Sequence, residues 1–194
     1  KETHSELYFA SDLVLEDYPC GLLGDYQFYN KKTVIQTLRV LQEKQLLQIS
    51  EDDIKNGFLK VIDNTHLQGR WQQLGTNPKI ICDTAHNAHG LTVVIEQLKK
   101  EKYNQLHLVL GVVNDKKLDD ILILLPKNAQ YYFCKPNISR GLEATVLQEK
   151  AATFGLNGAI YNSVSEAYEH SRKMAAAEDF IYVGGSTFVV AEIL

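Results

Sequence analysis

From about Ile80 to its C-terminal end, the sequence alternates short apolar segments with segments of helical periodicity. The apolar segments are rich in β-branched and aromatic residues, as strands are. They are Lys79–Asp83, Leu106–Val112, Gln130–Cys134, Gly158–Tyr161 and Phe180–Gly184. Nearly continuous apolar strands separated by helices are typical of a parallel sheet that is buried on both faces. The sequence therefore predicts a doubly wound, Rossmann-like α/β fold, with a mostly parallel sheet and helices on both faces.

Helical periodicity between these strands supports the same fold. Apolar residues spaced at i, i+3, i+4 and i+7 predict one helix over 91–98 and another over 118–125. Their apolar faces consist of Leu91, Val94, Ile95 and Leu98, and of Leu118, Ile121, Leu122 and Leu125. Ser163, with Glu166 three residues later, has the capping-box pattern that opens a further helix.

The first 66 residues follow a different pattern. The segment Leu7–Leu15 is apolar enough to predict a strand or hairpin, and two amphipathic helices are expected over about 31–47 and 51–63. Ser50 and Asp53 form a capping box at the start of the second helix. Because two helices and one short strand cannot close a core alone, we expect 1–66 to be the tail of a preceding domain, and 67–194 to be the α/β domain.

Charge and cysteine content exclude several classes of protein. The net charge of −4 provides no basic surface for nucleic acid or for an anionic membrane, and no apolar run reaches transmembrane length. Cys20, Cys82 and Cys134 are an odd, widely spaced set, which indicates core thiols in a reducing compartment rather than a disulfide framework. The polar N-terminal end does not resemble a signal peptide, so we expect a cytoplasmic protein. Since the chain begins with Lys, we also expect it to be part of a longer protein.

The segment Lys79–Gly90 carries the most specific chemistry. It predicts a buried strand that ends at the carboxylate of Asp83, then a polar turn, then a helix that starts near Asn87. Open α/β sheets bind ligands at this kind of position, where backbone N–H groups and the positive end of a helix dipole meet. The segment therefore predicts a ligand site at the carboxyl edge of the sheet.

Five short segments occur in a fixed order along the chain. They are Gly24-Asp25-Tyr26-Gln27-Phe28-Tyr29-Asn30, Gly69-Arg70-Trp71, Asp83-Thr84-Ala85-His86-Asn87, Gly111-Val112-Val113-Asn114-Asp115-Lys116 and Val183-Gly184-Gly185-Ser186. Together they resemble the C-terminal part of the Mur ligase family, and within it folylpolyglutamate synthase/dihydrofolate synthase. The chain departs from the family pattern at Tyr26, where a His is usual, and at Ala88 and Lys117, where Pro and Asp are frequent; it also lacks the Pro that often precedes Gly69. The resemblance implies a Mur ligase C-terminal domain over 67–194 and a remnant of the central ATPase domain over 1–66.

The resemblance also implies a reaction. ATP phosphorylates the carboxylate of folate or dihydropteroate, and the amine of glutamate attacks the acyl phosphate. It assigns Asn30, Arg70 and Asp83 to ATP, makes His86 and Ser186 candidates for glutamate binding, and gives Arg70 and His86 catalytic roles. These residue types suit the tasks: an Asn amide pairs with an adenine edge, an Arg fork binds phosphate oxygens, and an Asp accepts from ribose hydroxyls. The cofactors are then ATP and Mg²⁺; because the phosphate loop and the magnesium carboxylates of the family are absent from this sequence, the chain alone is expected to be inactive.

Several alternatives stay open at this point. Asn30, Asp83 and Ser186 each have the residue type of a helix cap. Asp83, His86 and His89 are spaced as zinc ligands on a helix would be, although no fourth ligand accompanies them. The chain is alternatively a non-catalytic α/β binding module, or part of another Mur-type amino-acid ligase. For the partners we expect small molecules only, with a homodimer of this chain through its N-terminal helices and a monomeric parent enzyme.

Overall fold

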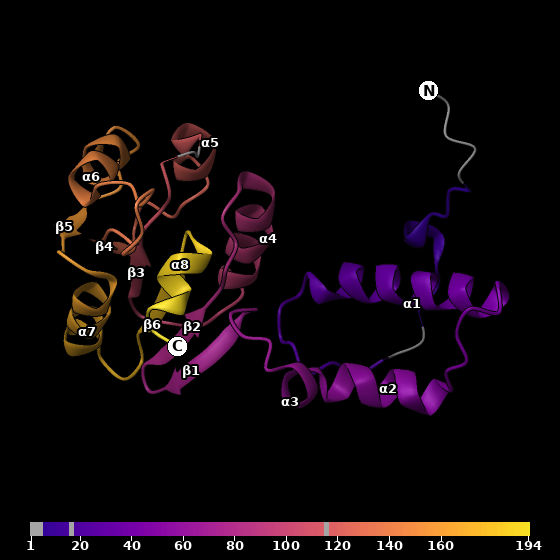
Figure 1. The fold of residues 1–194 in the computed structure, drawn as a ribbon. Helices are drawn as coiled ribbons and strands as arrows, with labels where there is room; N and C mark the ends of the chain where they lie inside the picture. Colours follow the sequence, from indigo (N-terminus) through magenta and orange to yellow (C-terminus); the bar gives the residue numbers. More distant parts are fainter. Residues whose placement is uncertain (1–5, 16–17, 115–116) are drawn as a thin grey trace, which may run out of the picture. The chain divides into compact units, whose positions relative to one another are not determined.

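Figure 1 shows the computed structural model of the chain, which describes residues 6–15, 18–114 and 117–194. The chain forms two compact units, Lys1–Leu67 and Gln68–Leu194. Within the described ranges, no helix combines the length and apolarity that a membrane span needs.

A six-stranded sheet forms the centre of the C-terminal unit. The strands are β1 (Gln72–Thr76), β2 (Lys79–Cys82), β3 (Leu106–Leu110), β4 (Gln130–Phe133), β5 (Gly158–Ile160) and β6 (Phe180–Gly184). They lie in the order β1-β2-β6-β3-β4-β5, and all neighbours are parallel except β1 and β2. The mostly parallel sheet predicted from the apolar segments is confirmed, and each segment is a strand.

The antiparallel edge strand β1 was not predicted. It begins with Gln72 and Gln73, contains Gly75, and has no fully buried residue. Such a strand lacks the apolar run from which the others were recognised, because only one of its edges is paired and its faces are half-covered.

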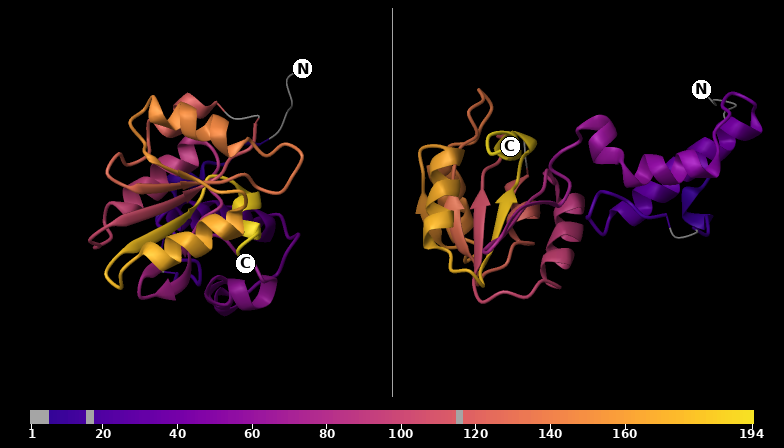
Figure 2. Two further views of the ribbon diagram at one scale, coloured as in Figure 1. Left: turned by 90° about the vertical axis from the view of Figure 1, so that its left-hand side faces the viewer. Right: turned by 90° about the horizontal axis from the view of Figure 1, so that it is seen from below.

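Helices cover both faces of this sheet. They are α4 (Ala88–Leu98), α5 (Leu118–Leu122), α6 (Ala144–Ala152), α7 (Val164–Met174) and α8 (Thr187–Ala191). The connections through α4, α5 and α6 run in the same direction across the sheet, so right-handed crossovers place these helices on one face. The helices α7 and α8 pack on the other face, and Figure 2 shows α6 and α7 on opposite sides of the strands. The predicted helix over 118–125 is shorter than expected, and α6 was not predicted from the sequence.

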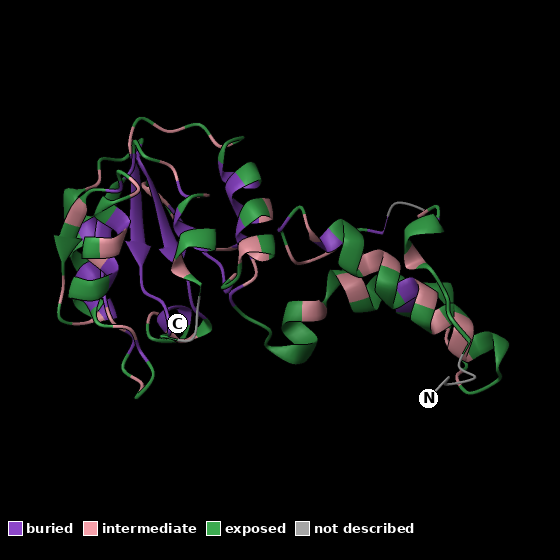
Figure 3. Cartoon of the chain, turned by 90° about the horizontal axis from the view of Figure 1, so that it is seen from above, coloured by how far each residue is buried: buried purple, intermediate pink, exposed green. Residues whose placement is uncertain are grey.

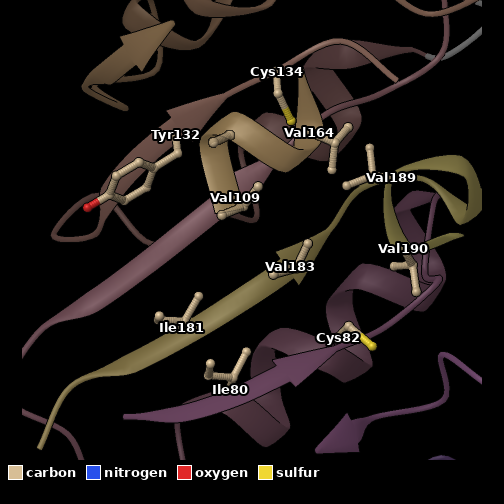
Figure 4. Close-up of a cluster of buried hydrophobic side chains, with 11 residues drawn as sticks. Ile80, Cys82, Val109, Tyr132, Cys134, Val164, Ile181, Val183, Val189 and Val190 are labelled. Carbon is tan, nitrogen blue, oxygen red and sulfur yellow. The ribbon is translucent and has the colours of Figure 1, made fainter. Parts of the chain in front are cut away.

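The core beneath α7 and α8 is drawn in Figure 4. Strand residues such as Val109, Ile181 and Val183 contact Val164 of α7 and Val189 of α8 in one buried cluster. Figure 3 shows the central strands buried along their length, as expected for a sheet that is covered on both faces.

The three cysteines are unpaired thiols. The predicted core position is confirmed for Cys82 and Cys134, which are buried, but not for Cys20, which is only half-buried. Burial, with a smaller contribution from nearby Asp83, raises the pKa of Cys82 to about 12, and burial also raises the pKa of Cys134 to about 12. Both thiols are therefore protonated and inert at neutral pH.

The N-terminal unit contains α1 (Gln27–Glu43), α2 (Glu51–Leu59), α3 (Val61–Thr65) and a short 3-10 helix, η1 (Ala10–Asp12). The predicted strand or hairpin over Leu7–Leu15 is wrong, because that segment contains η1 and no strand. Both helix predictions are confirmed in type but shifted: α1 starts four residues earlier, and the second helix is interrupted at Lys60. The capping box of Ser50 and Asp53 is present, with Asp53 N–H donating to Ser50 Oγ at 3.1 Å.

The N-terminal unit has a small core of its own. Leu13, Tyr18, Ile35 and Ile54 are its buried apolar residues. The Tyr18 hydroxyl donates to Glu51 at 2.7 Å, which ties the segment before α1 to the start of α2. Four buried apolar side chains among the described residues are few for a unit of this size, so much of the apolar surface of α1 and α2 stays exposed.

Candidate functional site

The candidate site lies where β2 and β6 end. These strands are parallel neighbours, with Cys82 opposite Val183, so the turns that follow them emerge side by side. The N–H of Asp83 donates to Val183 O at 3.1 Å, which holds the first residue of the β2–α4 turn to β6. This is the carboxyl edge of the sheet, where ligands bind in open α/β folds.

The turn Gly69-Arg70-Trp71 packs directly on the β2–α4 turn. Thr84 N–H donates to Gly69 O at 3.0 Å. Gly69 has φ +71°, and a Cβ added there would lie 2.7 Å from Cγ2 of Thr84, so both the backbone conformation and the close approach require glycine. Trp71 is buried and anchors the end of the turn.

Asp83 joins the two turns. It is 2% exposed; its Oδ2 accepts from Trp71 N–H at 2.7 Å and its Oδ1 accepts from Ala85 N–H at 2.8 Å. The alternative that Asp83 caps the following helix is wrong, because Asn87 is the N-cap of α4 and accepts from Gly90 N–H at 2.8 Å. A carboxylate oxygen accepts more than one hydrogen bond, so the contact with ribose stays a prediction.

The side chain of Arg70 lies over the β2–α4 turn. Its Nη1 donates to Thr84 Oγ1 and, at 3.4 Å, to Gly69 O. The guanidinium is half-buried and has five N–H donors, so these two contacts leave donors for a ligand. Arg70 is thus held beside the β2–α4 turn, as a phosphate contact there would need.

His86 and Ser186 line the same pocket, which has a volume of about 260 Å³. His86 lies in the β2–α4 turn, and its Nδ1 is 3.0 Å from Thr84 O. Because a carbonyl only accepts, Nδ1 carries the hydrogen and Nε2 is the acceptor of the neutral ring. Ser186 is the N-cap of α8 and accepts from Phe188 N–H at 3.2 Å, so the capping alternative is confirmed for this residue.

Arg140 was missed by the sequence analysis. It lies in the loop between β4 and α6, and it lines the pocket of His86 and Ser186 together with Phe188. Its guanidinium carbon lies 5.2 Å from the centroid of the Phe188 ring, a cation–π arrangement that holds the side chain against α8. A single Arg in a loop belongs to no periodic pattern and no spaced motif, so only the folded structure shows that it lines the pocket.

Asn30 lies in the N-terminal unit. It is an exposed residue in the first turn of α1, and its Nδ2 donates to Gln27 Oε1 at 2.9 Å. The N-cap position of α1 belongs to Tyr26, so the capping alternative for Asn30 is wrong. Its assignment to ATP stays a prediction.

The metal alternative receives no support from the geometry. In the described part of the chain, no three His, Cys, Asp or Glu side chains are grouped to hold a metal ion. Asp83 directs both oxygens to backbone N–H groups, while His86 lies in the turn before α4 and His89 in the helix itself.

The Asp115-Lys116 pair of the fourth sequence segment lies outside the described residues.

Fold and site together define an α/β domain of the Rossmann-like type, with a polar candidate site at the carboxyl ends of β2 and β6. Comparison with known proteins gives the family: the model of the Mur ligase, glutamate ligase domain matches residues 69–187, which is more than half of the chain. The chain therefore belongs to the Mur ligase family, as its motifs indicate.

The curated relatives share the name folylpolyglutamate synthase, which is paired with a second synthase activity in each of the two described next. The chain is 32% identical over 179 residues to a probable bifunctional folylpolyglutamate synthase/dihydropteroate synthase of Haloferax volcanii, covering 91% of this chain and 20% of that protein. It is 31% identical over 182 residues to the dihydrofolate synthase/folylpolyglutamate synthase of Escherichia coli, covering 93% of this chain and 40% of that protein. The chain thus spans less than half the length of these relatives.

Solved structures agree with the fold. E. coli FolC in complex with DHPP and ADP has a TM-score of 0.78 and 29% identity, covering 92% of this chain and 40% of that one. Mycobacterium tuberculosis folylpolyglutamate synthase complexed with ADP has a TM-score of 0.77 at 22% identity, which shows the shared fold.

Proposed function

We propose that this chain is the C-terminal part of an ATP-dependent ligase that joins glutamate to folate or to dihydropteroate through an acyl phosphate. The proposal rests on how the two turns and the pocket are arranged. His86, Arg140 and Ser186 line one pocket, and the turn that contains His86 is hydrogen-bonded to the turn that contains Arg70. A carboxylate-binding pocket beside a phosphate-binding arginine is what a ligase of this kind needs. The curated relatives are named as folylpolyglutamate synthases, which supports this proposal.

For the nucleotide, the proposal assigns Arg70 to the phosphate oxygens and Asp83 to the ribose, with Asn30 at the adenine. Arg70 presents a planar fork of donors, which suits phosphate and offsets the charge that develops during phosphoryl transfer. The residues that would hold Mg²⁺ are not assigned to this chain, since its described residues contain no such group. We place them in the preceding part of the protein, together with the phosphate loop, and we interpret 1–66 as the end of that ATPase domain.

For glutamate, the proposal assigns Arg140 to a carboxylate, and His86 and Ser186 to the orientation of the amino acid. The pocket of about 260 Å³ is small, in keeping with an amino acid rather than a pterin. Glutamate carries two carboxylates, and Arg140 provides the cationic fork that binds such a group with two hydrogen bonds.

The reaction follows from these positions. An oxygen of the folate carboxylate attacks the terminal phosphorus of ATP, the bond to the bridging oxygen breaks, and ADP leaves. The amine of glutamate then attacks the acyl carbon, the amide bond forms, phosphate leaves, and the amine releases its proton. Arg70 stabilises the charge on the transferred phosphoryl group, while His86 and Ser186 keep the amine of glutamate aligned with the acyl carbon.

Substitution of Arg140 tests the glutamate site in the complete ligase. We expect Arg140→Ala to raise the KM for glutamate by roughly tenfold to a hundredfold, because a charged hydrogen bond contributes about 1.5–3 kcal/mol. The KM for ATP should change little. Arg172→Ala is the matched control, because Arg172 also lies over an aromatic ring, at 5.6 Å from Tyr168, but outside the pocket.

Two outcomes would contradict the proposal. A parallel rise of the glutamate KM in Arg172→Ala would show that the effect is not specific to the pocket. Faster turnover with another amino acid than with glutamate would identify a different Mur-type amino-acid ligase.

A further inference from the structure

We infer that Thr84 is a positioning residue that holds the side chains of Arg70 and His86 at fixed positions relative to each other. The inference rests on the proposed function, in which Arg70 contacts phosphate and His86 faces the amino acid. Thr84 lies in the Asp83–Asn87 turn two residues before His86; its side chain contacts Arg70 and its backbone carbonyl contacts His86.

Three groups of Thr84 make three different contacts. Its N–H donates to Gly69 O at 3.0 Å, its Oγ1 accepts from Arg70 Nη1, and its carbonyl oxygen is 3.0 Å from His86 Nδ1. Thr84 is 9% exposed, while Arg70 is half-buried and His86 is exposed, so these contacts are partly shielded from bulk water. A partly shielded hydrogen bond to a charged donor is stronger than one at the open surface.

The side chain of Thr84 carries two separable functions. The hydroxyl must accept from Arg70, because a guanidinium has no acceptor. The methyl group packs against Gly69: a Cβ added at Gly69 would lie 2.7 Å from Cγ2 of Thr84. Valine keeps the methyl group and loses the acceptor, whereas serine keeps the acceptor and loses the methyl group.

The contact with Thr84 restricts a side chain that is otherwise flexible. A free Arg side chain samples many rotamers, and a phosphate contact must otherwise overcome this entropy at each turnover. A guanidinium that is held beforehand stabilises developing charge without reorganisation. Loss of the acceptor should therefore act on kcat more than on the KM for either substrate.

The first experiment measures geometry in the 194-residue chain. The guanidinium ¹⁵N–¹H signals of Arg70, assigned by their absence in Arg70→Ala, report whether the side chain is held. We expect Thr84→Val to move these signals toward the positions of exposed arginines, and Thr84→Ser to leave them near their original positions. Thr92→Val is the control, because the Thr92 hydroxyl is exposed on α4 and donates to Ala88 O at 2.8 Å.

The second experiment measures turnover in the complete ligase. We expect Thr84→Val to lower kcat by about tenfold, Thr84→Ser to restore most of it, and Thr92→Val to have no effect. In the Arg70→Ala background, Thr84→Val should add little, because a residue that acts through Arg70 has nothing left to position.

The outcomes separate the inference from the proposed function. Unchanged Arg70 signals in Thr84→Val, or equal kcat losses for the Val and Ser variants, would overturn the role of Thr84 while leaving the function intact. Near-normal turnover of Arg70→Ala would instead overturn the proposed role of Arg70, and the Arg70 signals would still decide whether Thr84 holds its side chain.

Discussion

The backbone N–H of Trp71 donates to Oδ2 of Asp83 at 2.7 Å, so the carboxylate that follows β2 helps to hold the turn that carries Arg70. The same carboxylate accepts from Ala85 N–H within its own turn. A buried acid that joins two turns of the site is a structural element of the site as well as a candidate ligand residue.

Replacing Asp83 should therefore destabilise the fold as well as affect nucleotide binding. In Asp83→Ala, the buried N–H of Trp71 and the half-buried N–H of Ala85 lose their acceptor, which costs about 2–4 kcal/mol of unfolding free energy. Urea unfolding of the chain measures this, with exposed Asp120→Ala as control. In the complete ligase, the KM for ATP should rise more than kcat falls. Unchanged stability of Asp83→Ala would mean that these hydrogen bonds contribute little.

Replacing Arg70 should lower turnover strongly and stability little, in contrast to replacing Asp83. Arg70→Ala removes a half-buried side chain with no part in the apolar core, so apart from the lost hydrogen bond to Thr84 little stability should be lost, and the melting temperature should fall far less than in Asp83→Ala. Its turnover in the complete ligase should fall in proportion to about 2–4 kcal/mol of transition-state stabilisation, by analogy with the loss of an oxyanion donor. Steady-state kinetics and a thermal melt on the same preparation decide the matter; normal turnover at an unchanged melting temperature would refute the assignment.

The chain by itself should be inactive. It belongs to a ligase family, but its sequence contains no Gly-rich phosphate loop, and its described residues have no group for a metal ion. An assay for ADP release with folate, glutamate and Mg²⁺ should give the rate of the blank. Release that depends on both folate and glutamate would show that the chain is a complete enzyme.

Asp179 should make stability dependent on acid pH. Burial raises the pKa of this carboxyl group, but hydrogen bonds from Ala176 N–H, His107 and Gln105 N–H outweigh it, so the pKa lies below its ordinary value. A lowered pKa stabilises the folded state at pH values above the ordinary value, and the stabilisation is lost as the pH falls through the folded-state pKa. Asp179→Asn should therefore destabilise the chain at pH 7 and much less near pH 3.

Urea unfolding at the two pH values measures this difference. Glu178→Gln is the control, because it removes a neighbouring exposed carboxylate. An equal loss of stability at both pH values would show that Asp179 stabilises the fold through its packing rather than through its charge.

The N-terminal helices should mediate a homodimer of this chain. Ile35 and Ile54 are buried within the unit, but Phe28, Tyr29 and Val34 of α1 are 48%, 67% and 44% exposed. Exposed apolar side chains gathered on one element favour association, and a two-fold dimer buries the same patch twice. We expect sedimentation over a concentration series to show a monomer–dimer equilibrium that Val34→Glu shifts to monomer.

A matched control for this test is Val146→Glu, because Val146 is 46% exposed on α6 of the other unit. A monomer at all concentrations, with 1–66 rapidly removed by protease, would refute the dimer.

Regular elements of the C-terminal unit could be predicted because their signals are local. Buried parallel strands such as β3 and β6 are continuous apolar runs, and Asn87 and Ser163 mark helix starts by their residue type. The edge strand β1 could not be predicted, since its polar residues become a strand only by pairing with β2. In the N-terminal unit, the apolar segment Leu7–Leu15 has the composition of a strand but no strand to pair with among the described residues.

The sequence by itself determined the motifs Gly69-Arg70 and Asp83–Asn87, on which the proposed function rests, because each motif is contiguous. Only the tertiary structure decided what those residues do for one another. The contacts of Asp83 with Trp71 and of Thr84 with Arg70 join separate turns, and Arg140 reaches the pocket of Ser186 from another loop. The physical reason is the parallel sheet: strands distant in sequence end at one edge, so their turns meet in space without any spacing that the sequence displays.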